Sequence, residues 1–200
     1  MTHPKRILFN FILGALTCLS LVGLSTPSFA QAVSSWIRPA DPYLTAEVHQ
    51  AETVLLAQGA SNASFQRFAA TLSRGAVVGA LPLGRATGAA GAVLSGDRLV
   101  VRGDFRNLTS PLRDYTVDPV DPPNPNITSA VHIHRGEPTA NGPFQYALTV
   151  TLGDAGNGRF AGEYTLTSEQ LQALSSGNLY LDLHTARNRA GELRGVLRPY

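Results

Sequence analysis

The chain has 200 residues, of which 44% are hydrophobic, and it contains 16 Lys and Arg residues, 14 Asp and Glu residues and one Cys. Lys5, Arg6 and Cys18 lie within the first thirty residues, so residues 31–200 contain 14 Arg and 14 acidic residues, no Lys and no Cys, and their net charge is zero. This composition excludes a polybasic nucleic-acid binder, a disulfide-stabilised scaffold, a zinc site built on Cys, and catalysis by a thiol or a Schiff-base Lys.

Residues 1–30 have the layout of a secretory signal peptide. Two cations precede an apolar run of 18 residues from Ile7 to Leu24, and small residues around Pro27 follow this run. We therefore expect cleavage after Ala30 and a secreted or periplasmic protein. The alternative is an uncleaved anchor helix, because the run approaches the length that spans a bilayer. However, no cationic stop-transfer cluster follows it.

Residues 31–64 are expected to form an N-terminal helical segment or linker. Asp41 is a suitable N-cap, Pro42 fits the first helical position, and Gly59 ends the pattern. Between them, apolar residues recur at helical spacings of four, three and four, at Leu44, Val48, Ala51 and Leu55. The pattern does not decide whether this helix packs on the following domain or only precedes it.

Residues 65–200 are expected to form one antiparallel all-β domain, a sandwich or a barrel. Apolar and polar residues alternate in short segments separated by Gly-rich turns, and the longest of these segments runs from Phe144 to Leu152. The segment from Phe68 to Ser73 alternates in the same way, but it also fits a helix after Ser64. The other alternating segments are residues 99–105, 160–166, 179–183 and 193–197.

Three segments depart from this alternation. Thr167–Gln170 has a capping-box pattern and predicts one short helix that ends at Gly177. Residues 118–126 contain four Pro, which predicts an exposed loop and a surface that a partner can reach. Gly88–Gly91 lacks the context of a phosphate-binding loop, so we interpret these small residues as part of a strand or a tight turn.

Two histidine-bearing segments are the candidates for metal binding. His132 and His134 alternate with apolar residues, and on a strand their side chains face the same way about 6.6 Å apart. His184 follows Tyr180 and Asp182 on the polar face of another predicted strand. If the two strands are neighbours, the three imidazoles converge on a site suited to copper or zinc, with Asp182 as a ligand or as a group that orients one.

A structural interpretation of these histidines competes with the metal site. In this interpretation, His132, His134 and His184 hydrogen-bond to loop carbonyls and fix the ends of two strands. An HxH pair alone is a weak signal, and His49 stands apart in the predicted N-terminal helix. The sequence therefore favours the structural role.

Glu192 and Arg194 share one face of the last predicted strand. We expect either an ion pair between them or bonds from each to a neighbouring turn. The functional alternative is that Arg194 binds an anionic ligand. The sequence has no GxSxG elbow and no phosphate-cradling loop, so no residue is predicted to be catalytic and no enzymatic activity is expected.

Four motifs, taken in order, resemble the CHRD domain family. They are His132–Gly136, Asn141–Pro143, Gly177–Thr185 and Gly191–Gly195, and the resemblance extends from about Phe65 to Pro199. It implies an immunoglobulin-like sandwich in an exported protein, with a strand at residues 68–73. It also implies an architectural role for the motif residues Gly136, Asn141, Gly142, Tyr180, Thr185, Gly191, Glu192, Arg194 and Gly195.

The chain departs from the CHRD pattern at two places. Family members often carry Asn where Asp182 stands and Pro-Gly-Gly where Arg189-Ala190-Gly191 stands, and residues 31–64 fall outside the family module. A looser similarity is to copper-zinc superoxide dismutase, which also has an HxH pair and a later His on a strand. The loop with the bridging His and the Cys pair have no counterpart here, so this similarity implies a copper-like site and not the reaction.

These expectations combine into one main function and one alternative. The main expectation is an exported, non-catalytic CHRD module without a cofactor, which binds or supports an extracellular or periplasmic macromolecule. No contact with nucleic acid is expected, and none with the membrane after the signal peptide is cleaved. The alternative is a copper- or zinc-binding protein that uses His132, His134 and His184 without a full catalytic set.

Overall fold

The computed structural model describes residues 41–79 and 81–200. The predicted signal peptide, the cleavage after Ala30 and the start of the N-terminal segment lie outside the described residues. No helix within residues 41–79 and 81–200 is both long and apolar enough to cross a membrane.

The described part of the chain forms ten strands and two α-helices. The helices are α2 (Pro42–Ala57) and α3 (Ser168–Ser175), and two short 3₁₀ turns, η1 (Asn62–Ser64) and η2 (Arg74–Ala76), flank the first strand. The strands are β1 (Gln66–Ser73), β2 (Thr87–Ser95), β3 (Arg98–Arg106), β4 (Val131–Arg135), β5 (Phe144–Ala147), β6 (Thr149–Leu152), β7 (Gly158–Thr165), β8 (Leu179–Leu183), β9 (Leu193–Val196) and β10 (Arg198–Pro199).

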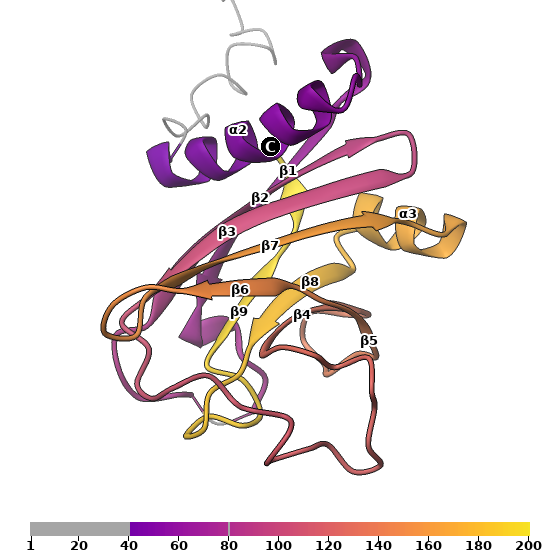
Figure 1. Cartoon of the computed structure of the whole chain (residues 1–200). Coiled ribbons are helices and arrows are strands. Elements are labelled where there is room, and N and C mark those ends of the chain that lie inside the picture. The colour runs from indigo at the N-terminus through magenta and orange to yellow at the C-terminus, as the bar shows by residue number, and fades with distance from the viewer. Residues whose placement is uncertain (1–40, 80) are drawn as a thin grey trace, which may run out of the picture. The chain divides into compact units, whose positions relative to one another are not determined.

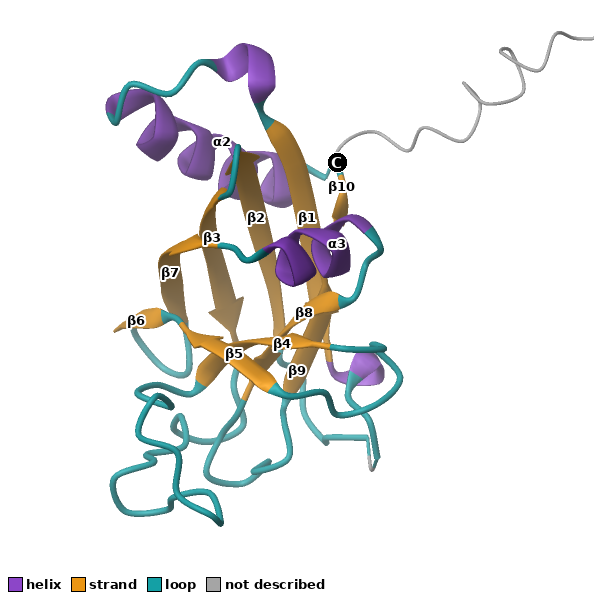
Figure 2. Ribbon diagram, turned by 90° about the vertical axis from the view of Figure 1, so that its right-hand side faces the viewer, coloured by secondary structure: helices purple, strands orange, loops and turns teal. Residues whose placement is uncertain are grey.

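All strand pairs are antiparallel, and the strands belong to one sheet in the order β5-β4-β8-β9-β1-β2-β3-β7-β6, with β10 paired beside β1. This confirms the prediction of an antiparallel all-β domain. Residues 68–73, which also fitted a helix, lie in β1. The sheet is strongly curved, and β4 and β5 lie across the ends of β1–β3 (Figure 2).

The two ends of the sheet meet at Leu148. Only this residue separates β5 from β6, and its N–H donates to the carbonyl of Val131 at 2.9 Å. The sheet is therefore nearly closed into a barrel. The prediction of one strand from Phe144 to Leu152 is wrong, because the chain turns a corner at the buried Leu148 and its two halves pair with β4 and β7.

A single apolar core fills the inside of the curved sheet. Leu72 and Phe105 reach it from β1 and β3, and Ile133 and Leu181 reach it from β4 and β8. Strands from both halves of the sheet therefore share one core. The described strands follow one hydrogen-bonded path, and in this respect they differ from the two separate sheets of the sandwich that the resemblance implied.

Helix α2 lies on the outer face of β1–β3 (Figure 1). It begins as predicted, because the side chain of Asp41 accepts a hydrogen bond from the N–H of Tyr43 at 2.9 Å and Pro42 is the first helical residue. Its buried residues pack against Val93 and Val100. A Cβ atom at Gly91 would overlap the backbone of Val48, so the glycine in β2 is what lets the helix approach this closely. The helix thus belongs to the same compact unit as the sheet.

Helix α3 has the predicted capping box. Thr167 accepts from the N–H of Gln170 at 3.3 Å, and the Gln170 side chain accepts from the N–H of Thr167 at 2.9 Å. Gln170 also bonds to Tyr146 and Gln145, which ties the helix to β5. The four-proline segment is a loop, as predicted, and Leu112 just before it forms an isolated bridge with Thr185.

Candidate metal centre

Strands β4 and β8 are antiparallel neighbours and place the three predicted histidines on one face. His132 lies opposite Asp182, and His134 lies opposite Tyr180. His184 follows directly after β8, and its N–H donates to the carbonyl of Ala130 at 2.9 Å. Since side chains two residues apart on a strand face the same way, the even spacing from Tyr180 to His184 puts its ring beside the HxH pair.

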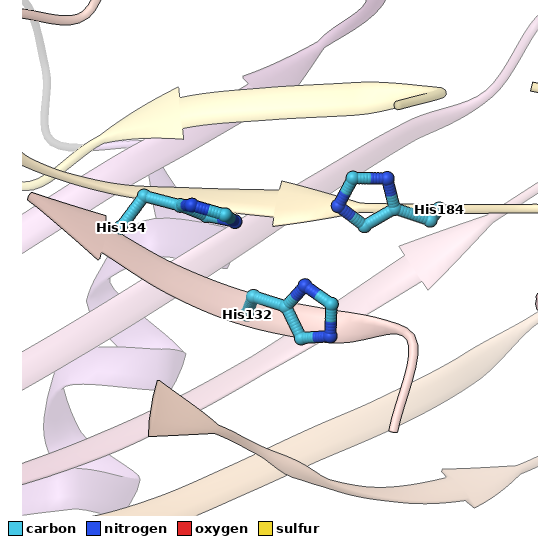
Figure 3. A group of neighbouring side chains, drawn as sticks. All are labelled: His132, His134 and His184. Carbon is cyan, nitrogen blue, oxygen red and sulfur yellow. The ribbon is translucent and has the colours of Figure 1, made fainter. Parts of the chain in front are cut away.

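The three rings converge on a common space (Figure 3). One possible ligand nitrogen from each of His132, His134 and His184 lies within 4.8 Å of the others, and the ring centroids are 5.0–6.3 Å apart. Two nitrogens bound to one ion at about 2.1 Å lie at most about 4.2 Å apart. Where two of these nitrogens lie as far as 4.8 Å apart, one of the two rings would therefore turn slightly inward when an ion binds.

Loop carbonyls fix the orientation and the tautomer of each ring. The Nδ1 atoms of His134 and His184 lie 3.0 Å from the carbonyls of Gly142 and Arg189. A carbonyl can only accept, so each Nδ1 carries the proton and each Nε2 keeps its lone pair. Both Nε2 atoms are buried and have no hydrogen-bond partner.

His132 uses its nitrogens the other way round. Its Nε2 lies 2.6 Å from the carbonyl of Ser129, so Nε2 carries the proton and Nδ1 keeps the lone pair. Each of the three rings thus donates a hydrogen bond from one nitrogen to a loop carbonyl, and its other nitrogen remains a potential ligand. A hydrogen bond of this kind to the second nitrogen is the usual way in which proteins orient a metal-binding His.

Burial keeps the imidazoles neutral. It lowers the pKa of His132 to about 3, and the neighbouring His184 adds to this effect. Burial also lowers the pKa of His134 and of His184, against the opposing attraction of Asp182. Because only a neutral imidazole can bind a metal ion, the cluster is held in the binding-competent state.

Asp182, predicted as a ligand or an orienting group, is bound elsewhere. Both of its carboxylate oxygens accept from Arg194, at 2.7 Å from Nε and 2.6 Å from Nη2. The nearer oxygen is 4.0 Å from Nε2 of His134, which is too far for a hydrogen bond. The converging nitrogens come from the three histidines, and the carboxylate of Asp182 is half of a buried ion pair.

Arg194 has no donor left for an anionic ligand. Its side chain is buried and makes five hydrogen bonds, two to Asp182, two to the carbonyls of Pro138 and Ala140 at 3.0 and 2.9 Å, and one to Asn141 Oδ1 at 2.8 Å. A guanidinium has five N–H donors. The expected bonds to a neighbouring turn are therefore present, and the predicted alternative of an anion-binding Arg194 is wrong.

Glu192 supports the turn that orients His184. Its buried carboxylate accepts from the backbone and hydroxyl of Thr109 at 2.8 and 2.9 Å, from Thr185 Oγ1 at 2.7 Å and from Asn188 Nδ2 at 2.9 Å. These bonds hold the turn at residues 185–191. In this turn, the carbonyl of Arg189 accepts the hydrogen bond from Nδ1 of His184. The expected ion pair between Glu192 and Arg194 does not form, since each has its own partners.

Tyr180 and Gly142 support His134 in a similar way. The Tyr180 hydroxyl accepts from the N–H of Gly142 at 2.6 Å and donates to the carbonyl of Ala140 at 3.2 Å. The Tyr180 ring stacks on the His134 ring, with their centroids 5.4 Å apart. The guanidinium of Arg194 lies 4.3 Å from the centroid of the same Tyr180 ring. A Cβ at Gly142 would overlap the Arg135 carbonyl, so this turn requires glycine.

The remaining glycines of the predicted motifs lie in the same framework. The N–H of Gly136 donates to the carbonyl of Asn178 at 2.9 Å, and Gly195 pairs with Leu181 between β8 and β9. Gly191 has a φ of 134°, which other residues rarely adopt, in the turn that carries Arg189. The motif residues thus form a scaffold around the histidines.

Two aromatic residues at the cluster were not predicted. The Tyr115 ring lies 5.4 Å from that of His132 and 6.4 Å from that of His184, and the Phe144 ring lies 5.2 Å from that of His132. Tyr115 comes from the loop after the bridge between Leu112 and Thr185, and Arg113 stacks on its ring at 4.6 Å. Neither residue has a sequence pattern that links it to the histidines, because both reach them through tertiary contacts.

A groove of about 890 Å³ adjoins the cluster. The four-proline loop and β6 line it, and Tyr115 and Ser129 belong both to its wall and to the surroundings of His132. The wall includes the apolar residues Leu112, Val120, Ile127, Leu148, Val150 and Leu152. The loop that the sequence marked as accessible thus borders the groove, and Tyr115 and Ser129, on either side of this loop in the chain, connect the groove to His132.

Comparison with known families supports one assignment. The family model described as the CHRD domain matches residues 68–197, a range that contains β2–β9 and all of β1 except its first two residues, and β10 lies just beyond it. It also contains the three histidines and the Arg194 and Glu192 networks. No curated protein and no solved structure matches the chain. The chain belongs to the CHRD domain family.

Proposed function

We propose that this protein is an exported, non-catalytic CHRD module that binds a copper or zinc ion through His132, His134 and His184. The observation that carries the proposal is the pair of buried Nε2 atoms of His134 and His184, which have no partner and lie at the space that these rings share with His132. A buried polar atom without a partner costs about 1–3 kcal/mol. A metal ion between the rings would remove this cost.

A purely structural role of the histidines accounts for only one of the two nitrogens in each ring. Bonds to the carbonyls of Ser129, Gly142 and Arg189 use one nitrogen of each ring and would fix the strand ends, as that interpretation requires. They leave the inward nitrogens unexplained. Imidazoles with one nitrogen held by a carbonyl and the other free are the arrangement that metal sites use.

Export is part of the proposal. The layout of residues 1–30 supports cleavage after Ala30 and a secreted or periplasmic location. We also propose that the curved sheet is a distorted immunoglobulin-like sandwich. The core that β1–β3 share with β4, β8 and β9 supports this, because two facing layers would bury the same residues.

A metal titration tests the proposal. Purified protein is titrated with Cu(I) under anaerobic conditions, with Cu(II) and with Zn(II), beside a His134→Ala/His184→Ala double variant and a His49→Ala control, whose histidine is exposed on α2. We expect one equivalent of metal to bind the wild type and the control, and none to bind the double variant at this site. Equal binding by all three proteins, or no binding by the wild type, would contradict the proposal.

The groove favours a second candidate function, the binding of a macromolecular partner. Leu152 on its wall is 69% exposed, and an exposed large apolar residue beside an apolar groove is typical of an interaction site. If this function holds, Leu152→Asp will abolish co-purification of the partner from the extracellular or periplasmic fraction. Leu83→Asp, at a residue that is 80% exposed and lies outside the groove, will leave this co-purification unchanged.

A further inference from the structure

We infer that the three-histidine site is selective for Cu(I) over Zn(II) and Cu(II). This inference rests on the proposed metal-binding function and narrows it to one ion. It follows from the number of ligands, the enclosure of the site and its charge, which are independent observations.

The number of ligands suits a three-coordinate ion. In the described part of the chain, the group of converging ligand atoms comprises three imidazole nitrogens, and the nearest carboxylate, Asp182, is held by Arg194. Zn(II) in proteins is almost always four-coordinate, and Cu(II) prefers tetragonal sites with nitrogen and oxygen ligands. Cu(I) is a d¹⁰ monovalent ion that is stable with three nitrogen ligands.

The enclosure of the site disfavours a water molecule as fourth ligand. The Nε2 atoms of His134 and His184 have no access to solvent. Aromatic rings surround the cluster, with Tyr180 stacked on His134, Phe144 edge-on to His132 and Tyr115 over His132 and His184. Ring faces and edges offer no ligand for a hard dication and no strong hydrogen bond for its water.

The charge around the site favours one positive charge over two. Asp182 pairs with Arg194, and Asp118 pairs with both Arg113 and Arg189, so these five residues contribute one positive charge. Glu192, bonded to Thr185 next to His184, has hydroxyl, amide and backbone partners, and its negative charge offsets this positive charge. The surroundings therefore carry no net charge, and a monovalent ion adds less charge to this buried region than a dication would, which makes it less costly.

Competition for metal tests the inference. Under anaerobic conditions, the protein is titrated with Cu(I) against a Cu(I)-specific chelator, and separately with Zn(II) and Cu(II) against chelators of known affinity. We expect one Cu(I) to bind at least 100-fold more tightly than Zn(II), three nitrogen ligands in the X-ray absorption spectrum, and a reduction potential of the bound copper above that of the aqueous couple. Zn(II) or Cu(II) binding as tight as Cu(I), or a fourth ligand on Cu(I), would overturn it.

A variant that adds a ligand separates the cause of the selectivity from metal binding in general. Tyr115→Asp places a carboxylate beside His132 and His184, and Tyr115→Asn is the neutral match. We expect the Asp variant to gain at least 10-fold in Zn(II) affinity relative to the Asn variant. No difference between them would overturn the argument from ligand number and charge. If the wild type binds no metal at all, the proposed function fails together with this inference.

Discussion

Each histidine of the cluster donates one hydrogen bond from its ring to a backbone carbonyl, and the three carbonyls come from three separate loops. Ser129 precedes β4, Gly142 precedes β5, and Arg189 lies between β8 and β9. The direction of each inward nitrogen is thus set by a loop and not by the strand that carries the ring. The position of these loops therefore determines the shape of the site.

Arg194 controls one of these loops, and Arg194→Lys tests this. A lysine has three donors on one nitrogen and cannot reproduce the five bonds to Asp182, Asn141 and the carbonyls of residues 138 and 140. We expect a loss of about 3 kcal/mol in the free energy of unfolding, measured with urea by circular dichroism, and weaker metal binding. Arg135→Lys, at an exposed ion pair with Glu169, should change stability by less than about 0.5 kcal/mol. Similar losses in both variants would contradict this role.

Glu47 provides a pH-dependent prediction away from the site. Burial against the sheet, together with the nearby Asp104, raises the pKa of this carboxyl above 4.5 in the folded protein. The folded state therefore binds the proton more tightly than the unfolded state, and the stabilisation is complete at low pH and lost as the pH rises through the raised pKa. Glu47→Gln should thus unfold at higher urea concentration than the wild type at pH 7, and the advantage should shrink at pH 4.

The matched control for this prediction is Glu52→Gln on the same helix. The Glu52 carboxylate pairs with Arg67 at 2.5 Å, so its removal should leave the urea midpoint at pH 7 unchanged or slightly lower. A gain in stability for Glu52→Gln equal to that of Glu47→Gln would show that the effect comes from helix charge in general and not from burial.

At the scale of the elements, the seating of α2 depends on one glycine. Gly91→Ala would push the new Cβ into the backbone of Val48, and the helix must move away from β2. We expect a loss of about 2 kcal/mol, as for overpacking in other cores, with faster hydrogen exchange in α2. Metal binding should not change, because the helix packs on β1–β3, whereas the histidines lie on β4 and directly after β8. Gly75→Ala, where no atom lies within 4 Å of the new Cβ, is the control and should have little effect.

The elements with a local cause could be predicted from the sequence. The N-cap at Asp41 and the capping box at Thr167 predicted both helices, and the even spacing of His132, His134 and His184 predicted three rings on one face. The corner at Leu148 could not be predicted, because alternation continues through it and only its contacts with β4 divide the strand.

The partners of the charged residues at the site could not be predicted from sequence patterns either. Asp182 is two residues from His184 and is a plausible metal ligand by spacing alone. In the sheet, however, Arg194 is its direct cross-strand neighbour, and the guanidinium fork occupies both oxygens. Tyr115 lies far from the histidines in the chain and reaches them through the bridge at Leu112. Such choices depend on strand register and loop path, which composition and periodicity do not encode.

At the scale of the whole molecule, metal binding should stabilise the fold. The three ligands come from β4 and from the end of β8, so the unfolded chain cannot reproduce the site. With free metal at 100 times the dissociation constant, the stabilisation is about 2.7 kcal/mol. For a domain of this size, we expect the melting temperature to rise by roughly 5–10 °C.

Calorimetry with and without metal measures this rise. The His134→Ala/His184→Ala variant, heated with the same metal concentration, should show no increase. An equal increase in both proteins would indicate that the metal binds elsewhere on the surface.

The corner at Leu148 also shortens the open edge of the sheet. Open sheet edges expose unpaired N–H and C=O groups that can recruit strands from other molecules. Here the strands at the two ends of the sheet, β5 and β6, have four residues each and meet at one point of the chain, where the N–H of Leu148 is already bonded to Val131. Little continuous edge remains as a template for aggregation. A thiol-free domain that cannot be locked by disulfides thus limits fibril-like growth through the closure of its sheet.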